Sequence, residues 1–285
     1  DKGKPIDVFV KERIDTNLLI EDFMLLANRE VPKYIYKSHK KNFGKDPVFI
    51  YRIHDEPDRD RIDQLAIFLK AAGHELNIQK GKTVSSKSLN SLFREIEGTP
   101  EENLIQTATI RSMARAVYST KNIGHFGLAF DYYTNFTSPI RRYPDLLVHR
   151  ILARFLDKNP IPQKEYNKYE GLTLHSSDRE AAAVEAERAS IKYKQVEYMK
   201  DHIGEEFDGV ITGITEWGVF VEESKTKAEG MIRISDLKDD YYELDKHGYG
   251  LSGKKTKKKY SLGDTVKIKL VNADLEEKTI DWKLM

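Results

Sequence analysis

The chain has 285 residues, with 47 Lys and Arg against 46 Asp and Glu, 39% hydrophobic residues and no cysteine. The missing cysteines exclude disulfides, cysteine nucleophiles and cysteine-ligated zinc, and they fit a reducing cytoplasm. No stretch approaches the roughly 20 apolar residues of a membrane span, so a membrane protein is not expected. A chain of this length most often forms about two domains.

The chain starts in the middle of a pattern, without Met. Ile6, Val8 and Val10 alternate with other residues, which predicts a strand. We therefore expect the sequence to be an excised segment of a longer protein.

Helical spacing dominates the next two hundred residues. It predicts a helix over 14–35 with its end disturbed by Pro32, and a second helix over 58–72 stopped by Gly73. An extended segment is expected between them. Further helices are predicted at 88–97, 100–118, 144–156 and 177–202, with strand and loop over 121–143.

The pattern of apolar and polar residues changes after Gly204. Residues 205–285 alternate apolar and polar residues in short runs separated by glycines, which is typical of a small β-barrel. We expect an α+β protein with one domain at 1–202 and a second at 203–285.

The run from Phe207 to Val221, Phe-Asp-Gly-Val-Ile-Thr-Gly-Ile-Thr-Glu-Trp-Gly-Val-Phe-Val, resembles the RNA-binding OB fold of the ribosomal-protein S-one type. The resemblance implies a five-stranded barrel whose exposed aromatics stack on unpaired bases while neighbouring cations bind phosphates. By this resemblance the RNA-binding face carries Trp217, Phe220, Arg233, Asp274 and Lys278. The alternative is that one or both aromatics belong to the barrel core. Lys254–Lys259 fits a solvated loop, or a contact with the RNA backbone.

Thr137-Ser138-Pro139-Ile140-Arg141-Arg142-Tyr143-Pro144-Asp145 is the most informative run of the first domain. A turn with two hydroxyls precedes two arginines and a helix start, where Pro144 and Asp145 suit the first turn. Hydroxyls, backbone N–H groups and a guanidinium can converge there on one phosphate. The alternative is a loop with solvated arginines.

This run closely resembles the signature of the ribonuclease II and ribonuclease R family, exonucleases that degrade RNA from the 3′ end. Three further stretches fit in the same order, Leu19–Asn28, Tyr51–Asp55 and Arg111–Met113. The resemblance implies a truncated, mixed α/β exoribonuclease catalytic domain followed by the OB-fold barrel.

The resemblance also implies roles for individual residues. Arg141 would clamp the scissile phosphate, Glu21 would contact the terminal nucleotide, and Glu187 would lie near the RNA end. Arg142, Thr137 and Ser138 are further RNA-binding candidates. Glu21 lies with Leu18, Leu25 and Asn28 on one helix face, where a buried carboxylate would need a partner; a partly exposed edge position is the alternative. For Glu187 an exposed helix charge is the alternative, and His125 is expected to be structural.

Members of this family use Mg²⁺ held by a compact group of aspartates, and the chain shows no such group. The acidic run from Asp55 to Asp63 lies at a helix start and contains Arg59 and Arg61. We expect it to cap the helix. No metal ligand is therefore assigned, and Mg²⁺ ligands are expected upstream of this segment.

These observations predict part of a processive, Mg²⁺-dependent 3′-to-5′ exoribonuclease acting on single-stranded RNA in the cytoplasm. The alternative is an RNA-binding or scaffolding protein with the same fold but no hydrolysis, and a weaker one is a DNA-binding barrel protein. No protein partner can be deduced.

Overall fold

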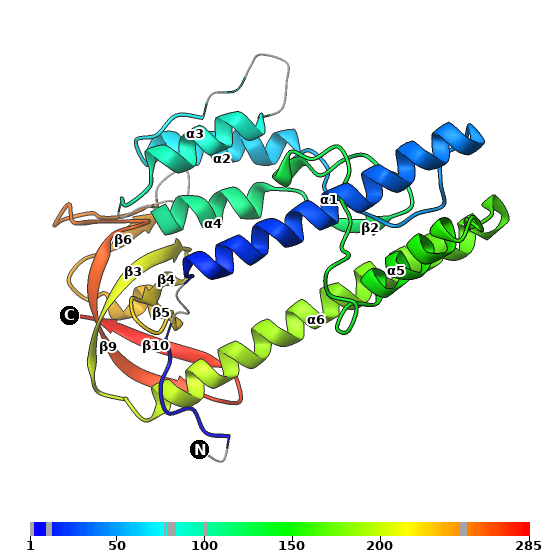
Figure 1. The fold of residues 1–285 in the computed structure, drawn as a ribbon. Helices are drawn as coiled ribbons and strands as arrows, with labels where there is room; N and C mark the ends of the chain where they lie inside the picture. The colour runs from blue at the N-terminus through cyan, green and yellow to red at the C-terminus, as the bar shows by residue number, and fades with distance from the viewer. Residues whose placement is uncertain (1–2, 10–12, 77, 79–83, 100–101, 245–249) are drawn as a thin grey trace.

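The computed structural model describes residues 3–9, 13–76, 78, 84–99, 102–244 and 250–285. Helices form one part of the molecule, and a β-barrel lies at one end of them (Figure 1). The helices are α1 (Asp15–Phe43), α2 (Arg59–Ala71), α3 (Ser86–Glu95), α4 (Glu102–Ser112), α5 (Tyr143–Leu156) and α6 (Tyr166–Lys200). Three short 3-10 helices are η1 (Phe126–Leu128), η2 (Gln163–Glu165) and η3 (Ile234–Asp236).

The sequence predicts that the first helix ends near Pro32. In the structure α1 continues through Pro32 to Phe43 and has 29 residues in all. A proline inside a helix leaves the carbonyl four residues earlier without its usual donor. Here the Asn28 carbonyl accepts a hydrogen bond from the Thr134 N–H at 3.1 Å instead. Pro32 is buried, so tertiary packing holds the helix across it. The proline therefore creates an attachment point for a distant loop.

Two apolar cores organise the helical part. One joins α1, α5, the start of α6 and the two-stranded antiparallel sheet of β1 (Tyr51–Ile53) and β2 (Val117–Ser119). The other joins α2, α3 and α4 around Leu69, Leu92 and Ile105. Helix α6 contributes Tyr169 to the first core and Val196 and Met199 to the barrel core. A single helix of 35 residues thus connects the two parts of the molecule.

The closed barrel has the strand order β10-β5-β4-β3-β9. Its strands are β3 (Glu206–Ile214), β4 (Gly218–Glu223), β5 (Glu229–Arg233), β9 (Thr265–Asp274) and β10 (Thr279–Leu284). Neighbouring strands are antiparallel except β5 and β10, which pair in parallel. This confirms the predicted five-stranded barrel. Gly218 is required by close packing, because a Cβ there would lie 2.4 Å from the Ile232 carbonyl oxygen.

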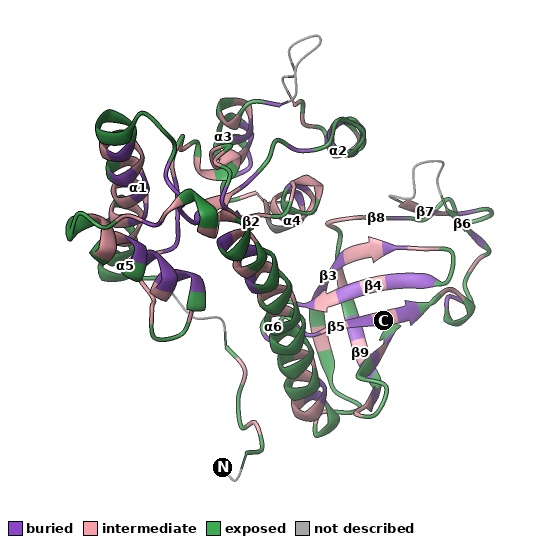
Figure 2. Cartoon of the chain, turned by 90° about the vertical axis from the view of Figure 1, so that its right-hand side faces the viewer, coloured by how far each residue is buried: buried purple, intermediate pink, exposed green. Residues whose placement is uncertain are grey.

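A small three-stranded sheet is inserted between β5 and β9. It consists of β6 (Tyr242–Leu244), β7 (Gly250–Gly253) and β8 (Lys259–Ser261), in that order. Figure 2 shows it at the edge of the barrel, and its buried residues Tyr242, Leu251 and Tyr260 belong to the barrel core. The sequence did not predict this sheet.

Three expected elements differ in the structure. The described residues 3–9 form no strand, and Val10 lies outside the described part. Helix α4 ends at Ser112 rather than 118, because residues 117–119 pair with β1. Helix α6 begins before 177, at Tyr166, and its early Ser and Thr hydroxyls bond to carbonyls three or four residues back. The predicted domain boundary, after residue 202, falls between α6 and β3.

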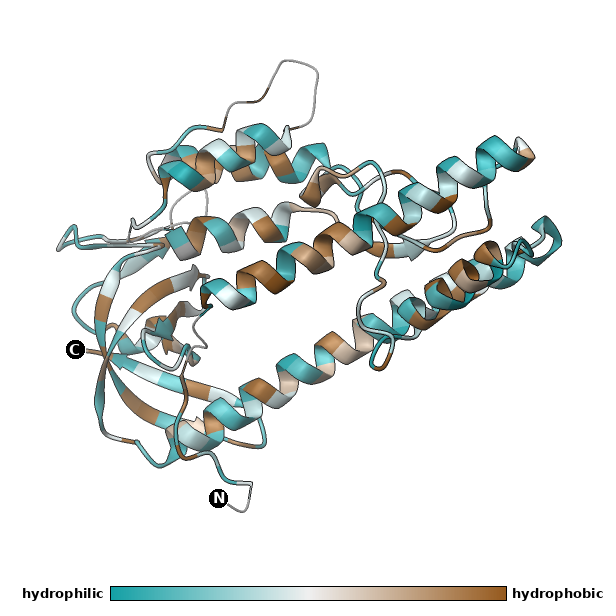
Figure 3. Cartoon of the chain, viewed as in Figure 1, coloured by the Kyte–Doolittle hydropathy of each residue, from teal (hydrophilic) through white to brown (hydrophobic). Residues whose placement is uncertain are grey.

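The first half of α1 is apolar yet exposed (Figure 3). Leu19, Ile20 and Phe23 are 55%, 58% and 60% exposed. No described helix is long and apolar enough to cross a membrane.

Candidate functional site: a phosphate-binding turn and an RNA-binding barrel face

The loop before α5 docks on α1 through Asn28. This buried side chain accepts a hydrogen bond from the Phe136 N–H at 2.9 Å and donates to the Tyr133 hydroxyl at 3.3 Å. Its carbonyl takes the Thr134 N–H in place of the donor that Pro32 lacks. Since the loop leads directly into Thr137 and Ser138, these bonds fix where the following turn begins.

Asp145 organises that turn from inside. The residue is completely buried, and its Oδ1 accepts the Ser138 N–H and an Arg142 Nη2–H, each at 2.8 Å. The Arg141 and Arg142 N–H groups both donate to the Ser138 carbonyl, which closes the turn. A buried carboxylate is stable only when donors or charges compensate it, and here the turn supplies both.

The two adjacent arginines point differently. Arg142 is half-buried against Asp145, whereas Arg141 is exposed and its guanidinium makes no ion pair or hydrogen bond with any described residue. Arg141 is therefore free to contact a ligand, and Arg142 holds the turn.

Three polar atoms around the turn are buried without a hydrogen-bond partner: Thr137 Oγ1, Arg142 Nε and Asp145 Oδ2. Unpartnered buried polar atoms are uncommon in folded proteins. Two of these atoms, Thr137 Oγ1 and Arg142 Nε, carry hydrogen-bond donors beside Arg141, whereas Asp145 Oδ2 can only accept.

A second polar network supports the same loop from the sheet side. Arg52 forms an ion pair with Glu180 at 2.6 Å and lies over the Tyr118 ring, with its Cζ 4.6 Å from the ring centroid. The Tyr118 hydroxyl accepts a hydrogen bond from Asn135 at 2.9 Å, and burial raises the pKa of this tyrosine. Nothing in the sequence distinguishes Glu180 from the other charges of a long helix, because only the fold places Arg52 beside it.

His54 and His125 are structural. The His54 Nδ1 accepts the Gly127 N–H at 2.8 Å, so its Nε2 carries the proton and donates to the Ala114 carbonyl at 2.7 Å. His125 caps η1 by accepting the Leu128 N–H, and burial lowers its pKa to about 4. The expectation of a structural His125 agrees with these contacts.

The two carboxylates expected near the RNA end are exposed. Glu21 is not buried, because no described segment covers this half of α1, and it pairs with Arg13. Of the two readings of Glu21, the structure agrees with the exposed edge position, although Asn28 on the same face is buried. Glu187 is an exposed residue of α6. Within the described residues, Glu21, Arg141 and Glu187 make no contact with one another.

The barrel face carries exposed aromatic and cationic groups. Trp217, at the turn between β3 and β4, is 73% exposed, which agrees with the surface position preferred for it. Phe220 is half-buried on the outward side of β4, facing Gly213 across the pair and opposite Met231. Arg233 follows on β5, exposed and 3.5 Å from Asp281.

Asp274 and Lys278 lie elsewhere on the barrel. Asp274 accepts the Glu276 and Glu277 N–H groups and so shapes the β9–β10 turn, in which Lys278 adopts a φ of 55°. Because β10 runs parallel to β5 and pairs Asp281 with Met231, this turn lies beside the start of β5, away from Arg233 and Trp217. The structure does not bring these two residues together with the aromatic face.

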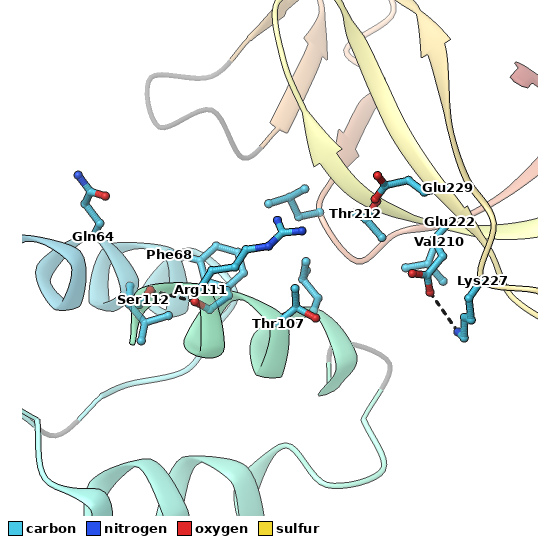
Figure 4. A pocket seen from close by; sticks show the side chains of 14 residues that line it. Gln64, Phe68, Thr107, Arg111, Ser112, Val210, Thr212, Glu222, Lys227 and Glu229 are labelled. Carbon is cyan, nitrogen blue, oxygen red and sulfur yellow. Dashed lines mark hydrogen bonds and ion pairs between the residues drawn. The ribbon is translucent and has the colours of Figure 1, made fainter. Parts of the chain in front are cut away.

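A pocket of about 390 Å³ lies between α2, α4 and the barrel (Figure 4). Arg111 of α4 points toward the strands, where Glu229 accepts a hydrogen bond from Thr212 and Glu222 pairs with Lys227. Thr212, Glu222 and Glu229 belong to the same outward face as Phe220. The barrel face is thus continuous with a pocket that the helical part closes.

The described residues do not fit a magnesium site. Asp58 of the acidic run caps α2 by accepting the Asp60 and Arg61 N–H groups at 2.9 and 3.3 Å, which confirms the predicted capping role. No group of three or more His, Asp or Glu side chains suited to a metal occurs in the described part of the chain.

Comparison with known proteins agrees with these features. The RNB domain model matches residues 1–158, and the S1 RNA binding domain model matches 200–284. Ribonuclease R of Aquifex aeolicus is 38% identical over 99% of this chain, and Ribonuclease R 1 of Lactococcus lactis is 39% identical over 100%.

The chain spans 39% and 34% of the length of these two relatives. A solved structure of Mycoplasma genitalium RNase R, in complex with ribose methylated single-stranded RNA, superposes with a TM-score of 0.84 at 28% identity, covering 99% of this chain and 44% of that one. With the fold, the turn and the barrel all in agreement, the chain belongs to the RNB domain family and carries an S1 RNA binding domain.

Proposed function

We propose that this chain is part of a processive 3′-to-5′ exoribonuclease that hydrolyses single-stranded RNA to nucleoside 5′-monophosphates in the cytoplasm. Residues 1–202 are then the C-terminal portion of a catalytic domain, and residues 203–285 are its RNA-binding barrel. The observation that carries the proposal is the exposed Arg141 on a turn held by the buried Asp145. The similarity to proteins named Ribonuclease R supports it.

In this proposal Arg141 binds the scissile phosphate and stabilises the negative charge that develops on its oxygens. Thr137, Ser138 and Arg142 complete the phosphate site in this proposal, and Thr137 Oγ1 and Arg142 Nε carry donors that no described residue uses. Glu21 contacts the sugar of the terminal nucleotide and Glu187 lies near it. A free guanidinium suits this task because its planar fork matches two phosphate oxygens.

We further propose that the full-length protein uses Mg²⁺, which would supply activation of the attacking water, and that its ligands would come from the part of the protein that corresponds to the unmatched length of the relatives. These relatives are more than twice as long as this chain. The residues described here contribute binding and orientation of the RNA. The barrel holds the strand through Trp217, Phe220 and Arg233, while Asp274 and Lys278 contact it at most from the opposite end of the face.

A second candidate is an RNA-binding protein without hydrolysis. The observation in its favour is the lack of an acidic metal-binding group in the described part of the chain. The two candidates share the barrel and the turn, so they differ in chemistry and not in binding.

A degradation assay distinguishes them. The 285-residue chain and the full-length gene product are each incubated with 3′-labelled and 5′-labelled single-stranded RNA, with Mg²⁺ or with EDTA. We expect stepwise shortening from the 3′ end by the full-length protein with Mg²⁺ only, and binding without turnover by the 285-residue chain. A full-length protein that binds RNA and never shortens it would establish the binder. Equal competition by a DNA oligomer would instead favour a general single-strand binder, because ribonucleases read the 2′-OH.

A further inference from the structure

The small sheet β6–β8 carries the densest positive charge of the described chain at its tip. Lys254, Lys255, Lys257, Lys258 and Lys259 surround the turn between β7 and β8, which we call the lysine turn. All five are exposed. The other side of the sheet is buried in the barrel core, so the lysine turn stands on a rigid base.

The turn itself is fixed from within by Asp240. Its carboxylate accepts hydrogen bonds from the Lys255 N–H at 2.9 Å, the Thr256 N–H at 2.6 Å and the Thr256 hydroxyl at 2.7 Å. Desolvation would raise its pKa, but these hydrogen bonds lower the pKa of Asp240 to about 2. Gly253 makes room for the carboxylate, because a Cβ there would lie 2.5 Å from Asp240 Oδ2.

The charges around the turn are only partly neutralised. Lys254 pairs with Glu243 at 2.6 Å, and Lys258 pairs with Asp239 at 3.5 Å. The side chains of the other three form no ion pair with any residue that the structure describes: Lys255, Lys257 and Lys259. Lys257 even occupies a φ of 58°, a conformation that favours glycine. Three cations thus remain available on a preorganised turn.

The small sheet that carries the lysine turn follows the end of β5 in the chain. Strand β5 ends at Arg233, and the next residue, Ile234, donates its N–H to the Trp217 carbonyl before the chain enters the small sheet. Beside the turn, Tyr241 is 67% exposed and lies under Lys254, with the ammonium 4.7 Å from the ring centroid. An exposed ring among cations is the usual composition of a single-strand binding surface.

We propose that the lysine turn is a second phosphate-binding site, which holds the backbone of a single-stranded RNA where the strand leaves the aromatic face of the barrel. The site rests on the proposed function, since it extends the RNA path that this function requires. Its contribution is electrostatic and independent of base sequence, and it requires a strand long enough to reach from Trp217 to the turn.

The test compares RNA binding by the 285-residue chain and by a triple variant, Lys255→Gln, Lys257→Gly and Lys259→Gln. Glycine at 257 removes the charge and fits the φ of 58°. A matched control variant carries Lys37→Gln, Lys158→Gly and Lys164→Gln. These lysines are exposed and lie at the end of the helical part away from the barrel, and Lys158 has a comparable φ of 59°. Fluorescence anisotropy is measured with 6- and 20-nucleotide RNAs over a series of salt concentrations.

We expect the triple variant to bind the 20-nucleotide RNA about tenfold more weakly at 0.1 M salt, with a salt slope lower by about 2, since each lost single-strand phosphate contact removes about 0.7. Binding of the 6-nucleotide RNA should be unchanged, and the control variant should match the wild type for both lengths. An unchanged slope, or equal weakening for both lengths, would overturn the second site. Absence of RNA binding by the wild-type chain would instead overturn the proposed function along with it.

Discussion

The turn over residues 137–145, which we propose binds phosphate, and the barrel face present cations to a ligand in opposite ways. At the turn, the exposed Arg141 depends on buried groups behind it, above all Asp145, Ser138 and Asn28. On the barrel, Trp217 and Arg233 stand on strands whose stability comes from the apolar core. A substitution of one exposed barrel residue should therefore affect RNA binding alone. A substitution in the turn should change its geometry, and with it both the stability of the fold and the catalytic rate.

The largest effect should follow from breaking the support of the turn. Asp145→Ala removes the carboxylate that accepts from Ser138 and Arg142 and leaves a half-buried guanidinium uncompensated. We expect the free energy of unfolding to fall by about 3 kcal/mol. Urea denaturation followed by circular dichroism measures it.

Asp145→Asn serves as the control for shape. It keeps an oxygen for the Ser138 N–H but not the charge that faces Arg142, so its loss should be about half as large. If Asp145→Ala were as stable as the wild type, the turn would not depend on this carboxylate, and the contrast with the barrel would disappear.

Arg141→Lys tests chemistry at the turn without its support. In the full-length protein we expect kcat to fall about 100-fold with little change in RNA affinity, because an ammonium cannot reproduce a bidentate guanidinium. Arg150→Lys, an exposed arginine on α5, is the matched control and should retain wild-type kcat. Single-turnover kinetics on single-stranded RNA separate the two effects. A wild-type kcat for Arg141→Lys would assign this residue to binding or structure.

The barrel was the easier region to predict from sequence. Its strands alternate over Phe207–Val221 and Thr279–Leu284, and the alternation places Val219 and Val221 inside and Phe220 outside. The small sheet β6–β8 escaped prediction because its strands have only three or four residues, too few for a period to show.

The turn was predicted as a phosphate site from residue types, but its support was not. No local pattern indicates that the Thr134 N–H donates to the Asn28 carbonyl. This carbonyl is free because Pro32 has no N–H, and Pro32 lies 102 positions before Thr134 in the sequence. Because of the same proline, the sequence predicts an end of α1 near residue 35, whereas the helix continues to Phe43. The sequence leaves the exposure of Glu21 open for a related reason, because a helical face shows which residues lie together and not what covers them.

Trp217→Ala tests the other side of the comparison. The ring is exposed and makes no contribution to the barrel core, so stability should be unchanged while RNA affinity falls by about 1–3 kcal/mol, the usual loss of one stacked base. In the full-length protein kcat at saturating RNA should stay at the wild-type value. Phe43→Ala, an exposed aromatic at the end of α1, is the control for anisotropy measurements. A loss of kcat at saturation would mean that the barrel face also positions the reacting end.

The smallest effect concerns acid. Burial lowers the pKa of His125 to about 4, with His54 and Arg52 acting in the same direction. The pKa of a histidine in the unfolded chain is about 6.5. Between about pH 6.5 and 4, His125 is therefore protonated in the unfolded state and neutral in the folded state. Acidification across this window should therefore destabilise the fold, by about 1 kcal/mol between pH 6.5 and 5 for a side chain that is still partly exposed.

Acid unfolding should begin in the helical part, because the His125 ring packs against Tyr133 of the loop that leads to the turn. The centroids of the two rings lie 5.1 Å apart. Both tryptophans, Trp217 and Trp282, belong to the barrel, so their fluorescence reports the barrel alone. Hydrogen exchange over 121–136 should accelerate at pH 5 before that fluorescence changes. His125→Asn keeps an acceptor for the Leu128 N–H and should flatten the pH dependence. If this variant lost as much stability on acidification as the wild type, a group other than His125 would cause the pH dependence. The region around the turn would then not be expected to unfold first.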